Sequence, residues 1–400
     1  MNSLFTHFTA FQTANTPSGE GEYIPYVTIY KGKGLPAPKR TSFQTMEMIV
    51  QFNRLEDRVD PFSTANGRFP ETFKNTSDTR DKMARYTTRQ QTYQFRTSVF
   101  SVGVFGKVAR LFRWDRAGCQ VTEPIKYTTE EGNRQLSEFF VRFDRLADDP
   151  EARGWDPTVK DATAKEVDDF AEAVRTAREE IFGPARRRTR ARKEINPKFL
   201  ELVSSVGDPS KYPRRRVSIP DGKVTRDYIV GDSTSMVDLP TGRSTRGYVA
   251  MAVETKRLVF LKDSWRLDLD SAESEDYWYK LLRRRRRGDV GMKNVGAYSH
   301  GSEVYATRNF VRCRDNKQRS LTQLYAKDYG RAEAMWGYIH HRVVQPELYL
   351  PLKTFRDSKH FTSVMYDIAL GEFILFIRCS SGVDPIDSSR ISAQGWDFPP

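Results

Sequence analysis

Apolar residues in the first half of the chain recur at two spacings, one typical of strands and the other of helices. The run 46–52 is apolar almost throughout and predicts a buried strand. Three stretches rich in β-branched and aromatic residues follow, separated by turn residues at 106–107 and 115–118: 95–105, 108–114 and 119–125. These stretches predict a three-stranded antiparallel meander.

Helical spacing appears in three other stretches of the first half. In 78–96 one face carries Met83, Tyr86, Gln90 and Tyr93. Apolar residues recur every three or four positions in two later stretches, 134–147 and 163–182. At the start of the last stretch, a threonine is followed three residues later by a glutamate, Thr163 and Glu166, which predicts a capping box.

The second half has shorter apolar runs separated by Gly, Pro and Asp. We expect short strands within 224–260 and a buried strand at 258–261 that ends at Lys262. The stretch 271–287 is acidic at its start and basic at its end, a charge order that suits the dipole of a helix. A further strand is expected within 338–350 and a further helix within 357–372.

These patterns together predict an α+β protein of two domains. Residues 183–216 contain Pro, Gly and two basic runs without hydrophobic periodicity, which favours a linker. We expect a disordered N-terminus at 1–22 and an α+β domain with the meander at 23–182. The basic linker at 183–216 then leads to a second domain at 217–372 and a divergent tail at 373–400.

Composition narrows the class of protein. The chain has 400 residues, of which 38% are hydrophobic and 12% aromatic, enough for packed cores. No apolar run approaches the roughly 20 residues of a membrane helix, so we expect no membrane partner. The N-terminus lacks the features of a secretory signal, and three scattered cysteines (Cys119, Cys313 and Cys379) do not suit a disulfide framework or a zinc cluster. The five histidines show no metal-ligand spacing, and we expect an intracellular location, cytoplasmic or nuclear.

The net charge of +13 is concentrated in three short runs. These are RRRTRARK at 186–193, RRR at 214–216 and RRRRR at 283–287. Basic patches of this kind can neutralise the phosphates of a nucleic acid or act as nuclear import signals. Solvated linkers and helix ends explain them equally well.

One constellation in the second half suggests phosphate chemistry. Gly242 and Gly247 lie in a turn flanked by strand-forming residues, a strand then delivers Lys262, and a helix with Glu273 and Glu275 near its start follows. Glycines let backbone N–H groups approach phosphates, a strand lysine neutralises phosphate charge, and a helix glutamate orients that lysine. This is the order of the small lobe of a protein kinase.

Several sequence strings resemble the fungal-type protein kinase family. They are 109–118, which ends in RWDRAG, RGWDPT at 153–158, and 260–266, which ends in LKDSWR; further runs at 51–52, 60–62, 121–124 and 242–250 also resemble the family. The resemblance extends over about residues 40–370. It implies an N-terminal α+β domain joined to a divergent kinase domain, of which this chain contains a small lobe and an incomplete large lobe.

The resemblance also implies roles for individual residues. Lys262 would pair with phosphates and Glu275 would be its helix partner, with Glu273 as the second choice. Nucleotide-binding positions would be Gly242, Arg243, Gly247, Val249, Ala250, Lys262, Val344 and Glu347. The segment 341–347 would form the strand and hinge beside adenine, and no metal-binding residue is assigned. The family would use ATP with Mg²⁺ and a protein substrate.

The chain departs from an active kinase in its last part. A catalytic-loop Asp, an Asn and a metal-binding Asp are required for phosphoryl transfer. No HRD-type motif occurs, and no asparagine follows Asn316. We therefore expect a truncated or non-catalytic member of the family that does not transfer phosphate. The alternatives are a basic nucleic-acid-binding protein and a scaffold that binds proteins.

Overall fold

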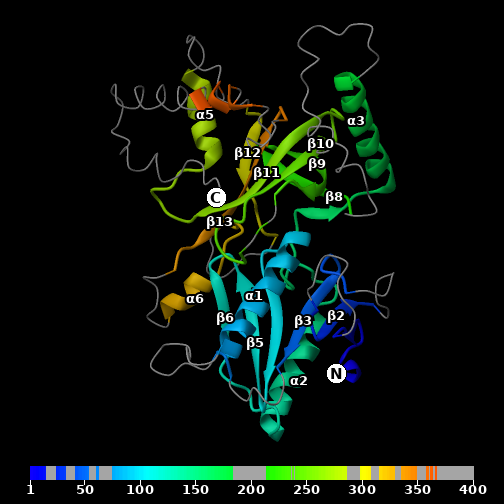
Figure 1. The fold of residues 1–400 in the computed structure, drawn as a ribbon, viewed down its shortest axis with the longest axis vertical. Helices are drawn as coiled ribbons and strands as arrows, with labels where there is room; N and C mark the ends of the chain where they lie inside the picture. Colours follow the sequence, from blue (N-terminus) through cyan, green and yellow to red (C-terminus); the bar gives the residue numbers. More distant parts are fainter. Residues whose placement is uncertain are drawn as a thin grey trace.

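The computed structural model has a mixed α+β fold with two β-sheets, drawn one above the other in Figure 1. This agrees with the α+β class expected from the sequence. The structure describes the following residues: 1–14, 24–32, 41–53, 60–62, 74–182, 213–235, 237, 239–285, 298–307, 315–328, 335–348, 357–359, 361–363 and 365–366.

The first sheet contains the predicted meander. Its strand order is β1-β2-β3-β4-β5-β6, and its strands are Phe8–Gln12, Val27–Lys31, Met46–Phe52, Val99–Phe105, Val108–Asp115 and Gly118–Val121. Strands β3 and β4 are parallel because helix α1 (Lys74–Tyr93) lies between them in the chain, whereas the other pairs are antiparallel. The predicted strand at 46–52 and the meander after it are confirmed.

Helices cover both faces of the first sheet. Phe140 and Phe143 of α2 (Glu130–Arg145) pack against Met48, Val50 and other apolar residues on one face. On the other face, Met83 and Tyr86 of α1 are buried in two further clusters. Both helices were expected from the apolar spacing. Of the four residues predicted to share one face of α1, Met83, Tyr86 and Gln90 are buried and Tyr93 is partly buried near Tyr86.

The start of the chain is ordered where the sequence analysis expected disorder. Residues Asn2–Leu4 form a 3-10 helix, η1, and β1 follows it at the edge of the first sheet. The cause is local packing, because Phe8 lies among the apolar residues beneath α2. The carboxylate of Asp144, near the end of α2, also accepts hydrogen bonds from the backbone N–H groups of Thr6, His7 and Phe8 at 2.9–3.3 Å.

The second sheet is antiparallel in every described pair. Its strand order is β12-β13-β11-β10-β9-β8-β7. The strands, in chain order from β7 to β13, are Val159–Asp161, Arg215–Asp221, Val224–Ser233, Arg246–Ala252, Leu258–Leu267, His300–Glu303 and Tyr338–Gln345. The sheet curls until β12 comes close to β8, and a core that includes Ile219, Tyr228, Tyr248 and Leu261 fills its inner face.

The two sheets do not divide the chain at 183–216, where the sequence analysis expected a linker. Strand β7 already belongs to the second sheet, and Phe170 and Val174 of α3 (Ala164–Phe182) pack on the outer face of that sheet. The apolar face of α3 thus packs against β9 and β10 of the second sheet and not against the first sheet. The predicted capping box begins this helix, because Thr163 and Glu166 exchange hydrogen bonds of 2.9–3.3 Å.

Two shorter helices complete the described structure. Helix α5 (Glu275–Arg285) follows β11, and α6 (Thr322–Asp328) lies near β6 of the first sheet. The expected strand within 338–350 is β13. Of the helix expected at 357–372, only short helical pieces within 358–366 lie among the described residues.

Candidate functional site

Lys262 and Glu275 form the ion pair that the sequence analysis expected. The Lys262 Nζ atom lies 2.7 Å from Glu275 Oε2, and both side chains are a little over a quarter exposed. Strand β11 continues to Leu267, so Lys262 lies in the middle of a strand and not at its end, as the apolar run had suggested. Glu275 begins α5 and, between the two glutamates considered, is the one placed on the lysine.

Helix α5 is held on the sheet by the residue after Glu275. Asp276 Oδ1 lies 2.7 Å from Nε2 of His341, a buried residue of β13. Asp276 Oδ2 also accepts a hydrogen bond from Lys280 at 2.5 Å. Gly301 of β12 lies under this turn, where a Cβ atom would come within 2.8 Å of Asp276 Cβ. The close approach of helix and strand fixes Glu275 over Lys262.

Burial and hydrogen bonding act in opposite directions on Asp276. Burial by itself raises the pKa of a carboxyl group. The hydrogen bonds from His341 and Lys280 outweigh burial and hold the pKa of Asp276 well below its usual range. Asp276 is therefore ionised at neutral pH and keeps its hold on both partners.

The predicted glycines lie at two different places. Gly247 is the register partner of Lys262 on the neighbouring strand β10, so it adjoins the ion pair. Gly242 and Arg243 instead lie against the first sheet and the far end of β11. The Gly242 N–H donates to the Arg116 carbonyl at 2.8 Å, and the Arg243 carbonyl accepts from the Trp265 N–H at 2.8 Å. Gly242 has a φ of +89°, which suits glycine in this turn.

The remaining predicted nucleotide-binding residues do not gather around Lys262. Val249 shares its face of the sheet but is buried with α3. Ala250 and Val344 point to the opposite, inner face and belong to the core of the curled sheet. Glu347 is exposed just after β13. Alternation along the strands explains the split, since neighbouring residues of a strand face opposite sides.

A buried network of charges lies on the inner side of the same strand. Asp263, next to Lys262, is 1% exposed and faces the first sheet. Its carboxylate lies 2.5 Å from His340 Nε2, 3.2 Å from Arg246 and 3.5 Å from Arg342 Nε. The ring of Trp265, two residues further along β11, stacks on the His340 ring with centroids 4.6 Å apart. We call these groups, with Asp156, the interface network.

Asp156 brings the first half of the chain into the interface network. Its carboxylate accepts hydrogen bonds from Arg342 at 2.5 Å and from Gln318 at 2.8 Å. Arg246 also donates to the backbone carbonyls of Gln91 and Gln94 at the end of α1, at 3.3 and 3.4 Å. The network therefore joins the two sheets, and it includes residues from both the RGWDPT and LKDSWR strings.

The RWDRAG string lies at the same junction between the sheets. Arg116 is buried and donates to Gln91 Oε1 at 2.7 Å and to the Pro240 carbonyl at 3.3 Å. Asp115 accepts hydrogen bonds from the N–H groups of Leu321 and Thr322 at the start of α6, at 2.7 and 2.9 Å. Burial lowers the pKa of Arg116 to about 9, with the nearby charge of Arg246 acting in the same direction. The three strings that carry the family resemblance are thus, in large part, packing elements.

Ionisation in the interface network follows from burial and neighbouring charges. Burial alone would raise the pKa of Asp263, but the His340 hydrogen bond and the charges of Arg246 and Arg342 hold it well below its usual range. Burial lowers the pKa of His340 despite the adjoining Asp263. At neutral pH the network accordingly holds two arginines against two carboxylates, and the His340 ring lies between the Asp263 carboxylate at Nε2 and the Gln318 amide oxygen at Nδ1.

The sequence analysis did not identify His340, Arg342 or Asp156 as partners of this network. Charged residues in the middle of apolar strands, as at Asp263 and Arg342, are the signal that points to buried pairs. The sequence also offered no reason to assign a role to the side chains that line a cavity beside β12.

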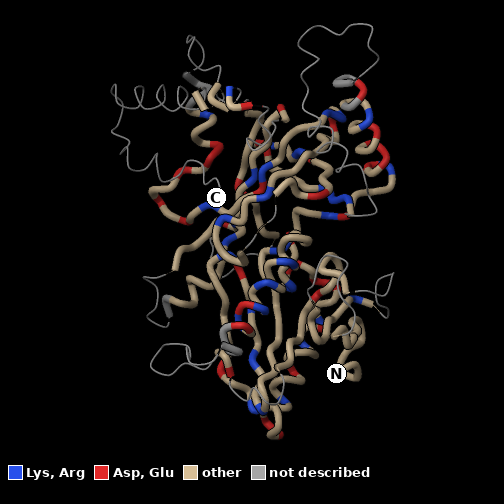
Figure 2. The backbone as a smooth tube through the Cα atoms, in the orientation of Figure 1, with Lys and Arg blue, Asp and Glu red and all other residues tan. Residues whose placement is uncertain are grey.

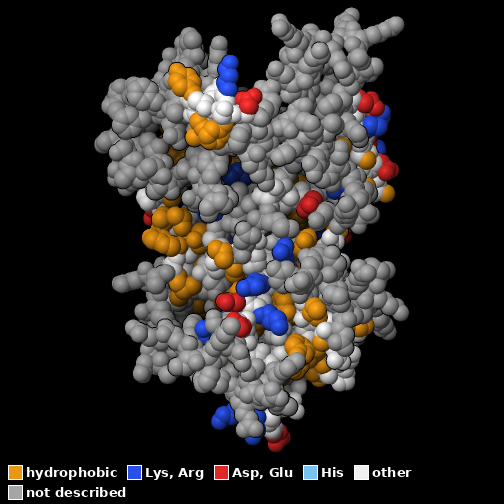
Figure 3. All heavy atoms as spheres, viewed as in Figure 1, with side chains coloured by type: hydrophobic (Ala, Val, Ile, Leu, Met, Phe, Trp, Pro, Cys, Tyr) orange, Lys and Arg blue, Asp and Glu red, His pale blue; other side chains and the backbone are white. Residues whose placement is uncertain are grey.

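Of the three basic runs, the structure describes the side chains of 214–216, and these arginines have partners within the chain. Arg214 lies with its guanidinium 5.1 Å from the Phe170 ring, Arg215 pairs with Asp161, and Arg216 pairs with Glu166 and Asp227. The run 186–193 lies outside the described residues, as do the side chains of 283–287. Figure 2 shows acidic and basic residues interspersed along the described chain. On the face drawn in Figure 3, charged side chains of both signs are scattered among hydrophobic ones.

The described residues include no helix that is both long and apolar enough to span a membrane. No group of three or more His, Cys, Asp or Glu side chains among them is arranged to hold a metal ion.

Comparisons with family models, with curated proteins and with solved structures gave no match for this chain. The resemblance to the fungal-type protein kinase family therefore stays a prediction from the sequence strings.

Proposed function

We propose that the second sheet is a protein-kinase-like small lobe in which Lys262 binds the phosphates of a nucleotide. We further propose that this chain does not transfer phosphate. The observation that carries the proposal is the 2.7 Å ion pair between a strand lysine and a glutamate of the following helix. In protein kinases such a pair positions the lysine on the α- and β-phosphates of ATP.

The surroundings of the ion pair suit an anionic ligand. Lys262 is partly exposed, so its ammonium group can exchange a contact with Glu275 for one with a phosphate oxygen. Gly247 lies across from it on β10, and the Phe260 ring and the Thr234 hydroxyl cover this glycine. The anchored start of α5 keeps Glu275 near and limits the movement of the lysine.

The base of a nucleotide has less room than its phosphates. Beyond Lys262 on the same face, Phe260 is paired with Val249, and α3 covers the sheet further along. We therefore place the phosphates at Lys262 and the purine on a part of the sheet that α3 does not cover. This arrangement, together with the missing catalytic-loop and metal-binding motifs, supports binding without phosphoryl transfer.

Nucleotide-dependent stabilisation of the full 400-residue chain tests the proposal. The unfolding midpoint would be measured with increasing ATP and Mg²⁺ for the wild type, Lys262→Met and Glu275→Gln. A ligand at 100 times its Kd stabilises a protein by about 2.7 kcal/mol. We expect saturable stabilisation of the wild type, loss of the effect in Lys262→Met and a weaker effect in Glu275→Gln.

A matched lysine supplies the control. Lys256 lies at the turn between β10 and β11 and pairs with Asp169 at 2.6 Å, away from α5. Lys256→Met should respond to ATP like the wild type. Equal stabilisation of Lys262→Met and the wild type, or no saturable effect in either, would refute the proposal. Transfer of labelled phosphate by the purified chain would refute its second part.

A further inference from the structure

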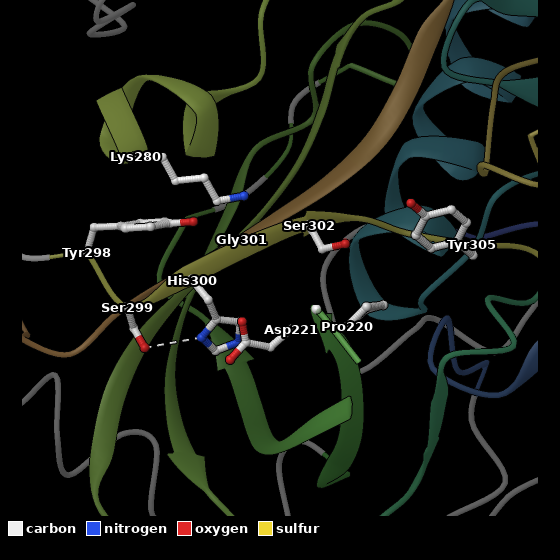
Figure 4. A pocket seen from close by; sticks show the side chains of 10 residues that line it. Pro220, Asp221, Lys280, Tyr298, Ser299, His300, Gly301, Ser302 and Tyr305 are labelled. Carbon is white, nitrogen blue, oxygen red and sulfur yellow. Dashed lines mark hydrogen bonds between the residues drawn. The ribbon is translucent and has the colours of Figure 1, made fainter. Parts of the chain in front are cut away.

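A cavity of about 880 Å³ opens where the curled second sheet fails to close. Strand β12, at one end of the strand order, forms one wall, and Pro220 and Asp221 at the end of β8, with Gly222 after them, form the other. Lys280 of α5 reaches it from the side. Figure 4 shows the Lys280 ammonium on one side of the cavity and Asp221 and Pro220 on the other, with β12 between them. We call this space the seam cavity.

Two side chains that line the seam cavity carry a hydrogen-bond donor. Lys280 contributes an ammonium group on an exposed side chain, with one contact to Asp276. The second donor is the hydroxyl of Ser299, which lies 3.1 Å from Nδ1 of His300 (Figure 4). Asp221 also lines the cavity, but Arg226 balances its carboxylate at 2.7 Å. Lys280 is paired with Asp276 in the same way, but it is the more exposed of the two charged side chains.

Buried His300 contacts the serine hydroxyl. His300 is 4% exposed, and its Nε2 atom lies 3.2 Å from the hydroxyl oxygen of Tyr228. Burial lowers the pKa of His300 and raises that of Tyr228, so both are neutral at pH 7. The His300 ring thus holds both hydroxyl groups, that of Tyr228 at Nε2 and that of Ser299 at Nδ1.

Aromatic side chains supply the apolar part of the site. The Tyr298 ring lines the cavity and stacks on Tyr279 with ring planes within 4° of each other, which holds it in place. Tyr305 lines the far end and is 41% exposed. Rigid tyrosine rings favour flat ligands, and cavities of several hundred Å³ suit small organic molecules.

From these observations we propose that the seam cavity binds a small organic anion with a planar ring, whose anionic group contacts Lys280. The site is separate from the nucleotide site proposed above and does not depend on it. Because Lys280 and Glu275 belong to the same helix, a ligand in the seam cavity would contact the element that positions Lys262.

Phenyl phosphate, a planar ring with one phosphate group, is the probe for the test. Its binding to the full chain would be measured by isothermal titration calorimetry, with benzamidine as the ligand of opposite charge. We expect saturable binding of phenyl phosphate, at least tenfold weaker in Lys280→Met and little changed in Ser299→Ala, because the Ser299 hydroxyl lies across β12 from Lys280. Benzamidine should not bind. Unchanged circular dichroism spectra would show that both variants are folded.

Two lysine controls separate this site from the proposed nucleotide site. Lys256→Met should bind phenyl phosphate like the wild type, whereas Lys262→Met should keep the binding that Lys280→Met loses. Loss of binding in Lys262→Met with full binding in Lys280→Met would place the anion at Lys262 and overturn the inference. No saturable binding, equal binding in Lys280→Met and the wild type, or equal binding of benzamidine would overturn it too.

Discussion

Replacing Asp263 by asparagine removes one negative charge from the interface network and changes the shape of the side chain very little. Asp263 is buried and faces three partners, His340, Arg246 and Arg342. In the variant, the two arginines keep Asp156 as their nearest carboxylate. We predict that Asp263→Asn destabilises the whole chain, because a buried positive charge is left without compensation.

The size of the effect follows from the distances. At an effective dielectric constant of about 20, a unit charge pair at 3.2 Å contributes roughly 5 kcal/mol, and a pair at 3.5 Å slightly less. Burying the Asp263 carboxylate costs several kcal/mol, which the asparagine avoids. The net loss in free energy of unfolding is therefore about 3–5 kcal/mol at pH 7, the range typical of broken buried ion pairs.

Urea unfolding followed by tryptophan fluorescence measures this loss. The six tryptophans include Trp265, whose ring stacks on His340 in the network. Asp169→Asn is the matched control, because its ion pair with Lys256 is on the surface and contributes about 0–1 kcal/mol. A loss below about 1 kcal/mol for Asp263→Asn, or one equal to that of the control, would refute the charge balance described for the network.

Three further predictions concern the caps, the turns and the histidines. Thr163→Ala should cost about 1 kcal/mol of stability by removing the capping box of α3, while Thr176→Ala, within the same helix, should cost little; urea unfolding compares them. Gly154→Ala should prevent folding, judged by circular dichroism, because a Cβ atom would lie 2.1 Å from the Ser98 carbonyl oxygen; Gly32→Ala, also at positive φ but with open space, should fold with a modest loss. Burial lowers the pKa of His340 and of His300 below 6.5, so the unfolded chain binds more protons as the pH falls from 7 to 5. The free energy of unfolding should then decrease, by at most about 1.4 kcal/mol per pH unit for each histidine, and the decrease should be smaller in His340→Gln.

The regular elements of the fold could be predicted from the sequence because their apolar spacing is strong. The strand at 46–52, the meander and the first three helices all appear near the expected positions. The pairing between distant segments could not be predicted, since periodicity identifies a buried face but not its partner. The apolar face of α3 shows this, because it fits either sheet by composition and packs on the second.

The contacts of the candidate site could be predicted where the two residues are close in the sequence. Lys262 and Glu275 are 13 residues apart, and a strand followed by a helix brings them together. Residues such as Asp156 and Arg342 are 186 positions apart, and only the assembled sheets reveal their contact. Ala250 and Val344 were assigned to the site by resemblance, whereas strand alternation turns both to the inner face.

Neighbouring opposite charges on β11 have a consequence for how the second sheet assembles. Lys262 points to one face of the strand, where it pairs with Glu275. Asp263 points to the opposite face, where it belongs to the interface network. A slip of one residue in the pairing of β11 would turn every side chain of the strand to the other face. It would bury the Lys262 ammonium beside Arg246 and Arg342 and expose Asp263. This alternation therefore selects against misregistered sheets during folding, independently of any ligand.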